Sequence, residues 1–327
     1  MLRRPFPTLL YAVLAAASLA CTAGTNNSAR NASLGVPAAA GSPASLPVRS
    51  TATPVASFPL TVKRSDGTDL VIKSAPKRIA SLSAGTTEIF YAIGAQSQLI
   101  ATDKYSDFPE QAKNTTKLDA FRPSLEAITA LSPDLVVVVD NQQQVVENLD
   151  RLGIAVLYLK VPASLQETLQ QIQFYGDVTA HPGEAQRVAA GMRARIDAVQ
   201  RKLTGIQQGP RVYTEIDVKL FSAAPNSFIG DLLSTVKAQN IVPAGEKPYP
   251  QITQEFIIAK DPEVIIIADV ELGESADTVK ARPGWSAISA VRNGRVYGID
   301  TNLVERPGPR IVDGLEALAK ALYPDKF

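Results

Sequence analysis

The sequence contains one structural unit twice, and this repeat limits the folds that the chain can adopt. The segments 126–140 and 255–269 each begin with Glu, carry Pro seven positions later and end with Asp. In both segments a helical pattern precedes the Pro, and the apolar runs Leu135–Val139 and Val264–Ala268 precede the final Asp. A continuous β-branched run fits a parallel strand that is buried on both faces. The repeat therefore predicts two similar α/β lobes.

Expected strands and helices alternate on both sides of this repeat. An Asp66-Gly67 pair between two apolar triplets predicts a β-hairpin over residues 60–72. The first lobe then has expected strands at 78–83, 99–102, 135–139 and 156–159, with helices at 86–93, 124–131, 143–152 and 165–175. The second lobe has expected elements at 211–216, 228–236, 253–259, 264–268, 295–299 and 311–322. This order favours mainly parallel sheets in both lobes.

One long helix separates the two lobes. Pro182 suits a first helical turn, and apolar residues recur at steps of three and four from Val188 to Leu203. About 22 residues at 1.5 Å each span about 33 Å, the width of a small domain. We therefore expect an N-terminal lobe at 57–178, a linking helix at 179–206 and a C-terminal lobe at 207–327. Such an arrangement predicts a ligand cleft between the lobes, at the carboxyl ends of the parallel strands.

The N-terminus has the pattern of an export signal. Two arginines precede an apolar run, and a small residue, Ala20, comes directly before Cys21. Residues 1–20 are therefore predicted to be a signal peptide, and the only cysteine is the expected lipidation site; simple cleavage after Ala20 is the alternative. Residues 21–56 are rich in small and polar residues and predict a flexible tether. We expect a protein anchored by lipid on the outer face of the cytoplasmic membrane, periplasmic or at the cell surface.

The composition excludes several functional classes. Lys and Arg number 33 against 32 Asp and Glu, which argues against a nucleic-acid-binding protein. One Cys, one His and two Met cannot form a metal site from His, Cys and Met ligands. The only histidine, His181, stands beside Pro182 and is interpreted as a surface or capping residue. No Gly-x-Ser-x-Gly, P-loop or Cys-x-x-Cys motif is present. We expect no enzyme, no catalytic or metal-binding residues and no cofactor.

Several motifs, in order along the chain, resemble one protein family. They are RIASLSAGTTE at 78–88, YSDFP at 105–109, PSLE at 123–126, SPDLV at 132–136, YPQITQE at 249–255 and ERPGPRI at 305–311. Together they resemble the periplasmic binding proteins for cobalamin and ferric siderophores, and vitamin B12 binders most of all, over residues 58–327. The resemblance implies a class III, chelatase-like binding fold in a monomer. It also implies the extracytoplasmic substrate-binding subunit of an ABC importer, with a permease dimer and its ATPase as partners.

The resemblance also implies a set of site residues. Two glutamates, Glu126 and Glu255, would pair with arginines of the two permease subunits. Their alternative role is to stabilise the helix dipole, by about 0.3–1 kcal/mol each. Residues of both cleft rims would contact the ligand, unless they belong to ordinary surface loops: Ser83, Gly85, Tyr105, Phe121, Asp140, Asn141 and Gln142 on the first lobe, and Asp217, Lys219, Phe221, Asn302, Glu305 and Arg306 on the second. Trp285 is interpreted as a packing anchor.

The expected ligand is a metal that arrives already chelated. A cobalamin or another corrinoid is favoured, because only Lys219 and Arg306, with Lys104 in addition, could neutralise an anionic catechol siderophore. A ferric siderophore comes next. A haem-binding importer subunit is an alternative. In that case Tyr105 alone would be available to coordinate the haem iron. Two further alternatives on the same fold are a sensor or adhesin that does not transport, and a chelatase-like enzyme.

Overall fold

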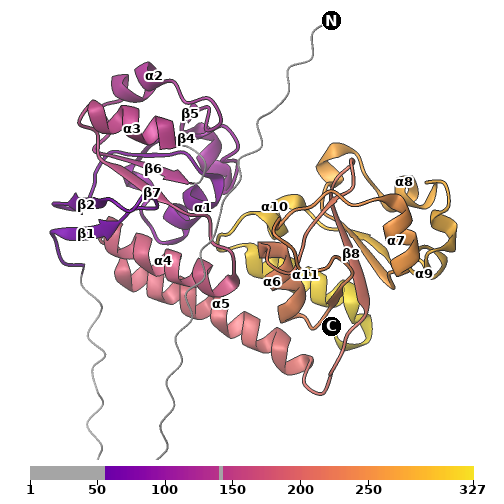
Figure 1. Cartoon of the computed structure of the whole chain (residues 1–327). Coiled ribbons are helices and arrows are strands. Elements are labelled where there is room, and N and C mark those ends of the chain that lie inside the picture. The colour runs from indigo at the N-terminus through magenta and orange to yellow at the C-terminus, as the bar shows by residue number, and fades with distance from the viewer. Residues whose placement is uncertain (1–55, 140–142) are drawn as a thin grey trace, which may run out of the picture. The chain divides into compact units, whose positions relative to one another are not determined.

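The computed structural model describes residues 56–139 and 143–327, all of which lie in one compact unit. It contains two five-stranded sheets and a separate two-stranded hairpin (Figure 1). The predicted signal peptide, tether and lipidated Cys21 lie outside the described residues, as do Asp140, Asn141 and Gln142. Among the described residues no helix is both long and apolar enough to cross a membrane.

The N-terminal lobe is built on a parallel sheet with the strand order β5-β4-β3-β6-β7. The predicted hairpin is confirmed as β1 (Leu60–Lys63) and β2 (Asp69–Ile72), which pair antiparallel. The strands of the sheet are β3 (Ile79–Ser81), β4 (Leu99–Asp103), β5 (Thr116–Leu118), β6 (Leu135–Val139) and β7 (Val156–Leu159). Its helices are α1 (Ala84–Ala92), α2 (Leu125–Ala130), α3 (Gln143–Arg151) and α4 (Leu165–Thr179). Short 3₁₀ turns occur at Gln96–Gln98 and Glu110–Asn114.

The C-terminal lobe has a second sheet with the order β10-β8-β11-β12, and β9 pairs antiparallel with β8. Its strands are β8 (Arg211–Asp217), β9 (Phe221–Ser222), β10 (Gln239–Asn240), β11 (Val264–Ile267) and β12 (Val296–Gly298). Its helices are α6 (Phe228–Thr235), α7 (Gln254–Lys260), α8 (Ala276–Lys280), α9 (Ser289–Arg292), α10 (Thr301–Glu305) and α11 (Ile311–Leu322). Short 3₁₀ turns lie at Val270–Leu272, Trp285–Ala287 and Pro324–Lys326.

The predicted linking helix is α5 (Pro182–Lys202), which lies beside α4 below both lobes in the view of Figure 1. Met192, Ile196 and Val199 are buried on its inner face, as the apolar spacing predicts. Arg195 on the same helix donates to Asp313 and Glu316 of α11, at 2.6–2.8 Å. These contacts hold the last helix of the C-terminal lobe against the link.

The sequence repeat is also a repeat of local structure. Ser124 and Thr253 occupy the N-cap positions of α2 and α7, and each side chain accepts a hydrogen bond from the backbone N–H three residues later. Each helix leads into a residue with left-handed backbone geometry, Ser132 with φ 47° and Asp261 with φ 44°. The Pro that follows in each copy then directs the chain into a strand that is buried throughout in β11 and in all but its last residue in β6.

An arginine at or directly before the start of the neighbouring strand makes equivalent hydrogen bonds to each repeat unit. The neighbouring strand is β3 in the first lobe and β8 in the second. In the first, the Arg78 side chain donates to the carbonyl of Ser132 while Asp134 accepts from the Arg78 N–H. In the second, Arg211 donates to the carbonyl of Asp261, and Glu263 accepts from the Arg211 N–H. The two copies of the repeat therefore share their order of helix, Pro and strand and also the contacts that connect them to a neighbouring strand.

Candidate functional site

A cavity of about 730 Å³ lies between residues of the two lobes. That volume is within the range of small-molecule binding sites. The N-terminal lobe contributes the carboxyl ends of β3, β4 and β6 and the loops after β4 and β5. The C-terminal lobe contributes the turn after β11 and helix α10. The lining residues are Leu82, Ser83, Ala84, Asp103, Tyr105, Ala120, Phe121, Val139, Glu271, Asn302, Glu305 and Arg306.

Six residues that the sequence suggests as ligand contacts line this cavity: Ser83, Tyr105, Phe121, Asn302, Glu305 and Arg306. Gly85 lies beside it, in a smaller pocket of about 190 Å³ that shares Ser83, Glu305 and Arg306. Asn302 and Glu305, expected in a loop, belong to the short helix α10.

Three other suggested contacts lie at a different place in the C-terminal lobe. Asp217, Lys219 and Phe221 are in the β8–β9 turn, where the Asp217 carboxylate accepts from the Lys219 N–H at 2.7 Å. None of the three is among the residues that line the 730 Å³ cavity. Their contact with a ligand stays a prediction, as does that of residues 140–142.

Two exposed aromatic side chains form the N-terminal wall of the cavity. Tyr105 is 46% exposed and Phe121 77% exposed, and their rings meet edge to face with centroids 5.5 Å apart. Asp103 accepts from the Tyr105 N–H at 2.8 Å, and Asp119 accepts from the Phe121 N–H at 2.9 Å. These side-chain contacts fix the backbone that carries the rings. Exposed aromatic pairs of this kind provide a surface for a large, partly apolar ligand.

The C-terminal wall of the cavity is acidic. Glu271 accepts a hydrogen bond from the Asn302 amide at 2.6 Å, and Glu305 lies one residue before Arg306. Partial removal from water, with the negative charges of Asp269 and Glu271 nearby, raises the pKa of Glu305 to about 7. The wall can therefore hold either a proton or a negative charge near neutral pH, and it suits hydrogen-bond donors of a ligand.

Asp269, the last residue of the sequence repeat, lies buried next to this wall. It is 2% exposed, and neither carboxylate oxygen has a hydrogen-bond partner among the described residues. Burial, and then the nearby charge of Glu215, raise its pKa to about 6. Unpartnered buried carboxylates are rare, and they are costly when charged.

The charge of Arg282 offsets the raised pKa of Asp269 only in part, because other acids occupy its guanidinium. It donates to both oxygens of the fully buried Glu215 at 2.5 and 2.6 Å, and to Glu274 at 2.8 Å. Its guanidinium also stacks on Trp285, 4.6 Å from the ring centre. Trp285 is fully buried in the C-terminal core, which confirms its interpretation as a packing anchor.

Arg306 is less available to a ligand than the sequence suggests. One of its guanidinium nitrogens lies 2.6 Å from Asp107 and 3.6 Å from Glu88, both on the N-terminal lobe. The remaining charged residues that line the cavity are Asp103, Glu271 and Glu305. The cavity therefore presents more negative than positive charge. Sequence reasoning missed Asp103 and Glu271, which no motif marks.

The two glutamates suggested for permease docking occupy equivalent places in the repeat. Glu126 lies in the first turn of α2 and Glu255 in the first turn of α7, and both are exposed. Within the described parts of the chain, neither carboxylate has an ion pair or hydrogen bond. His181 is at the N-cap of α5, where its side chain contacts the Thr179 carbonyl and does not cap the helix. No group of three or more acidic, His or Cys side chains in the described residues is placed to hold a metal ion.

Comparisons with known proteins agree with a cavity between two α/β lobes. A family described as periplasmic binding protein matches residues 79–303. An uncharacterized ABC transporter substrate-binding lipoprotein, YvrC of Bacillus subtilis, is 30% identical over 278 residues, which cover 83% of this chain and 87% of that protein. A vitamin B12-binding protein of Vibrio campbellii is 29% identical over 243 residues, 73% of this chain and 86% of that one. The crystal structure of the periplasmic vitamin B12 binding protein BtuF of Vibrio cholerae has a TM-score of 0.67 and 27% identity, and covers 76% of this chain and 97% of that one.

Proposed function

The chain belongs to the periplasmic binding protein family, and on this premise we propose that it is the extracytoplasmic substrate-binding subunit of an ABC importer. The family and the relatives above are named as binding proteins, and the solved Vibrio cholerae structure shares the fold of this chain. The observation that carries the proposal is the 730 Å³ cavity with aromatic residues on one wall and acidic residues on the other.

The ligand that suits this cavity best is a metal complex that carries little negative charge. No metal-binding group is found among the described residues, so the metal would arrive with its coordination shell already filled. Tyr105 and Phe121 provide a surface for an extended ring system. Glu271 and Glu305 accept hydrogen bonds, and they repel carboxylate and catecholate groups. A corrinoid, whose periphery carries amide N–H groups, meets these requirements, and two of the relatives are named for vitamin B12.

The sequence repeat suggests how the protein delivers its ligand to the permease. We infer that Glu126 and Glu255 form ion pairs with two equivalent sites on a dimeric permease, because their carboxylates are exposed and have no partner within the described residues. Cys21 would carry the lipid that keeps the protein at the outer face of the cytoplasmic membrane. The name of the Bacillus relative, a lipoprotein, supports this anchor.

A haem-binding importer subunit is the second candidate. Tyr105 favours it, because this residue lines the cavity, is 46% exposed and carries a phenol oxygen that could coordinate the haem iron. The acidic C-terminal wall counts against it, because haem carries two propionate groups.

Calorimetric titration with cyanocobalamin, a ferric hydroxamate, a ferric catecholate and haem tests the proposal. We expect the corrinoid to bind with the highest affinity and with little dependence on salt concentration. A matched pair of variants locates the site: Phe121→Ala removes an aromatic ring at the cavity, and Leu152→Ala removes an exposed apolar side chain elsewhere on the same lobe. Binding of none of the four compounds would contradict the proposal. High-affinity, salt-sensitive binding of the catecholate alone would contradict the choice of corrinoid.

A further inference from the structure

Besides the linking helix, an ion-pair network connects the two lobes. It lies where the segment that follows α10 meets α1 of the N-terminal lobe. Glu88 on α1 is 3% exposed, and its two carboxylate oxygens accept from the Nε and a terminal nitrogen of Arg310, at 2.9 and 2.6 Å. Such two-pronged pairing of a guanidinium with a carboxylate fixes both distance and orientation.

The same carboxylate lies close to a second arginine, one that reaches the ligand cavity. A guanidinium nitrogen of Arg306 is 3.6 Å from Glu88 and 2.6 Å from Asp107. Arg306 lines the cavity and Glu88 does not. Glu88 therefore joins the connection between the lobes to a side chain at the ligand site.

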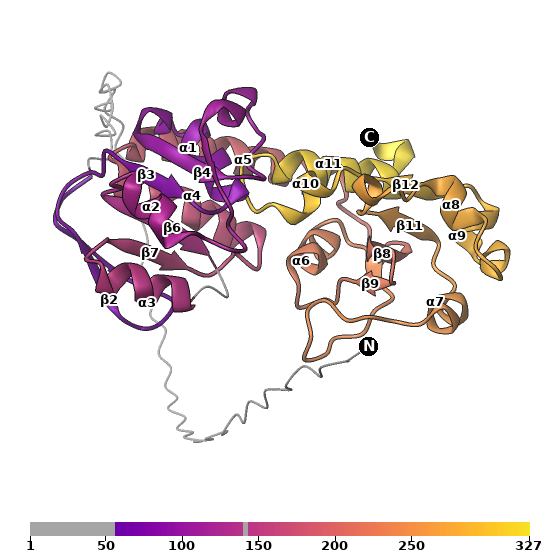
Figure 2. The ribbon, with the colours of Figure 1, turned by 90° about the horizontal axis from the view of Figure 1, so that it is seen from above.

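The backbones of the two lobes approach closely at this network. A Cβ atom at Gly85 would lie 3.0 Å from the Pro307 carbonyl oxygen, closer than ordinary van der Waals contact allows. The Phe108 ring lies beneath the Arg310 guanidinium, 4.0 Å from its centre. Both contacts place the segment 306–310 against the N-terminal lobe, and both views show α10 beside that lobe (Figures 1 and 2).

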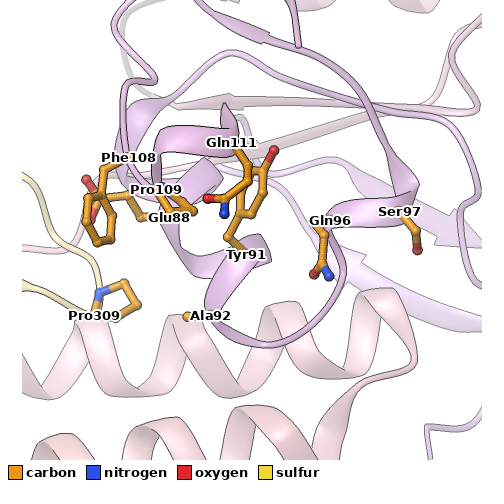
Figure 3. Close-up of a pocket in the computed structure, with 9 residues that line it drawn as sticks. All are labelled: Glu88, Tyr91, Ala92, Gln96, Ser97, Phe108, Pro109, Gln111 and Pro309. Carbon is orange, nitrogen blue, oxygen red and sulfur yellow. The ribbon is translucent and has the colours of Figure 1, made fainter. Parts of the chain in front are cut away.

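Cavities flank the network on two sides. The ligand cavity lies at the start of α1, and a second cavity of about 570 Å³ lies along the later part of the same helix (Figure 3). Glu88, Phe108 and Pro309 are in the wall of the second cavity, which shares no lining residue with the first. The ion pairs of Glu88, together with the Phe108 and Gly85 contacts, therefore join the two lobes at a point that lies between two open spaces.

We propose that Glu88 is a positioning residue for ligand binding, which sets the spacing of the two lobes through Arg310 and the orientation of Arg306 at the cavity. Its effect on binding rests on the proposed function, whereas its effect on lobe spacing does not. In Glu88→Gln a neutral amide of the same shape replaces the carboxylate. The guanidinium groups of Arg306 and Arg310 would then lose the negative charge that both of them contact. Breaking one side of a buried pair in this way is far more disruptive than removing an exposed pair.

The test compares Glu88→Gln with a matched control, Glu215→Gln. Glu215 is also buried and is held by Arg282 with the same two-pronged geometry, at 2.5 and 2.6 Å, but both residues belong to the C-terminal lobe and neither lines the ligand cavity. Spin labels on cysteines introduced at Lys73 and Asp277, one exposed position on each lobe, report the interlobe distance in full-length protein with Cys21→Ser.

We expect Glu88→Gln to broaden the interlobe distance distribution in the free protein, whereas Glu215→Gln leaves it unchanged. Saturating cyanocobalamin should narrow the broadened distribution again, and the affinity of Glu88→Gln should fall about tenfold. Asp107→Asn, at a half-exposed position, removes one contact of Arg306 and keeps the Glu88–Arg310 pair, so it should lower the affinity less and broaden the distance distribution less than Glu88→Gln does.

Identical distance distributions and affinities in the Glu88 and Glu215 variants would overturn the proposal. If Glu88→Gln does not fold, Arg310→Lys takes its place, because it keeps the positive charge and loses the two-pronged contact with Glu88. An unchanged distance distribution in Arg310→Lys would then overturn the proposal. If wild-type protein does not bind cyanocobalamin, the proposed ligand is wrong. The distance measurements then decide the positioning role without a ligand.

Discussion

Replacing Asp269 by Asn should stabilise the protein, and the gain should grow with pH. Asp269 is buried with no hydrogen-bond partner for its carboxylate among the described residues, and burial is the main cause that raises its pKa from 3.8 to about 6. The folded state therefore holds the proton more tightly than the unfolded state does. The tighter binding of this proton stabilises the folded state relative to the unfolded state. This contribution is fully present below pH 3.8 and is lost as the pH rises through about 6.

The size of this effect follows from the shift. A change of about two pKa units, at about 1.4 kcal/mol per unit, makes the charged form cost about 3 kcal/mol at pH 8. At pH 5 the same two pKa values give a cost of about 2 kcal/mol. Asn keeps the shape and carries no charge, so its stabilising effect should be about 1 kcal/mol larger at pH 8 than at pH 5.

Urea denaturation followed by circular dichroism at pH 5 and pH 8 measures both free energies of unfolding. Asp277→Asn is the matched control, because the Asp277 side chain is 95% exposed and its replacement should change stability little at either pH. If Asp269→Asn is no more stable than wild type at pH 8, or if its effect is the same at both pH values, the reasoning about this buried carboxylate is wrong.

Three other changes test the proposed site, the docking surface and the anchor. Phe121→Ala should weaken corrinoid binding about 5- to 150-fold, which corresponds to about 1–3 kcal/mol, while His181→Ala should leave the calorimetric affinity unchanged; equal effects of the two would refute the aromatic contact. Glu126→Ala and Glu255→Ala should each leave binding within about twofold and lower uptake of labelled ligand, most of all together; normal uptake in the double variant would refute docking. Cys21→Ala should release the protein from the membrane fraction on centrifugation, and equal partitioning of both forms would exclude a lipid anchor.

The sequence predicted the larger elements of the fold because their signals are local. The N-cap residues Ser124 and Thr253, the prolines after α2 and α7 and the β-branched runs of β6 and β11 lie within short segments. The strands β5, β9 and β10 and the helices α8, α9 and α10 were not predicted. They contain only two to five residues, too few to show an apolar period.

The cavity could be predicted only in part, for the same physical reason. Tyr105 and Phe121 lie in or near motifs that a single stretch of sequence displays. The acidic character of the opposite wall depends on Glu271 meeting Asn302, which is 31 positions further along the chain. The pairing of Arg306 with Asp107 joins residues 199 positions apart and depends on how the lobes approach one another. No local pattern encodes either contact.

The bound molecule itself tests the central claim most directly. Native mass spectrometry of the mature protein, purified without denaturation from the cells that produce it, measures the mass of any retained ligand. We expect one corrinoid per chain, released on unfolding with a corrinoid absorption spectrum. A retained haem or an anionic siderophore in place of the corrinoid would contradict the account of the cavity.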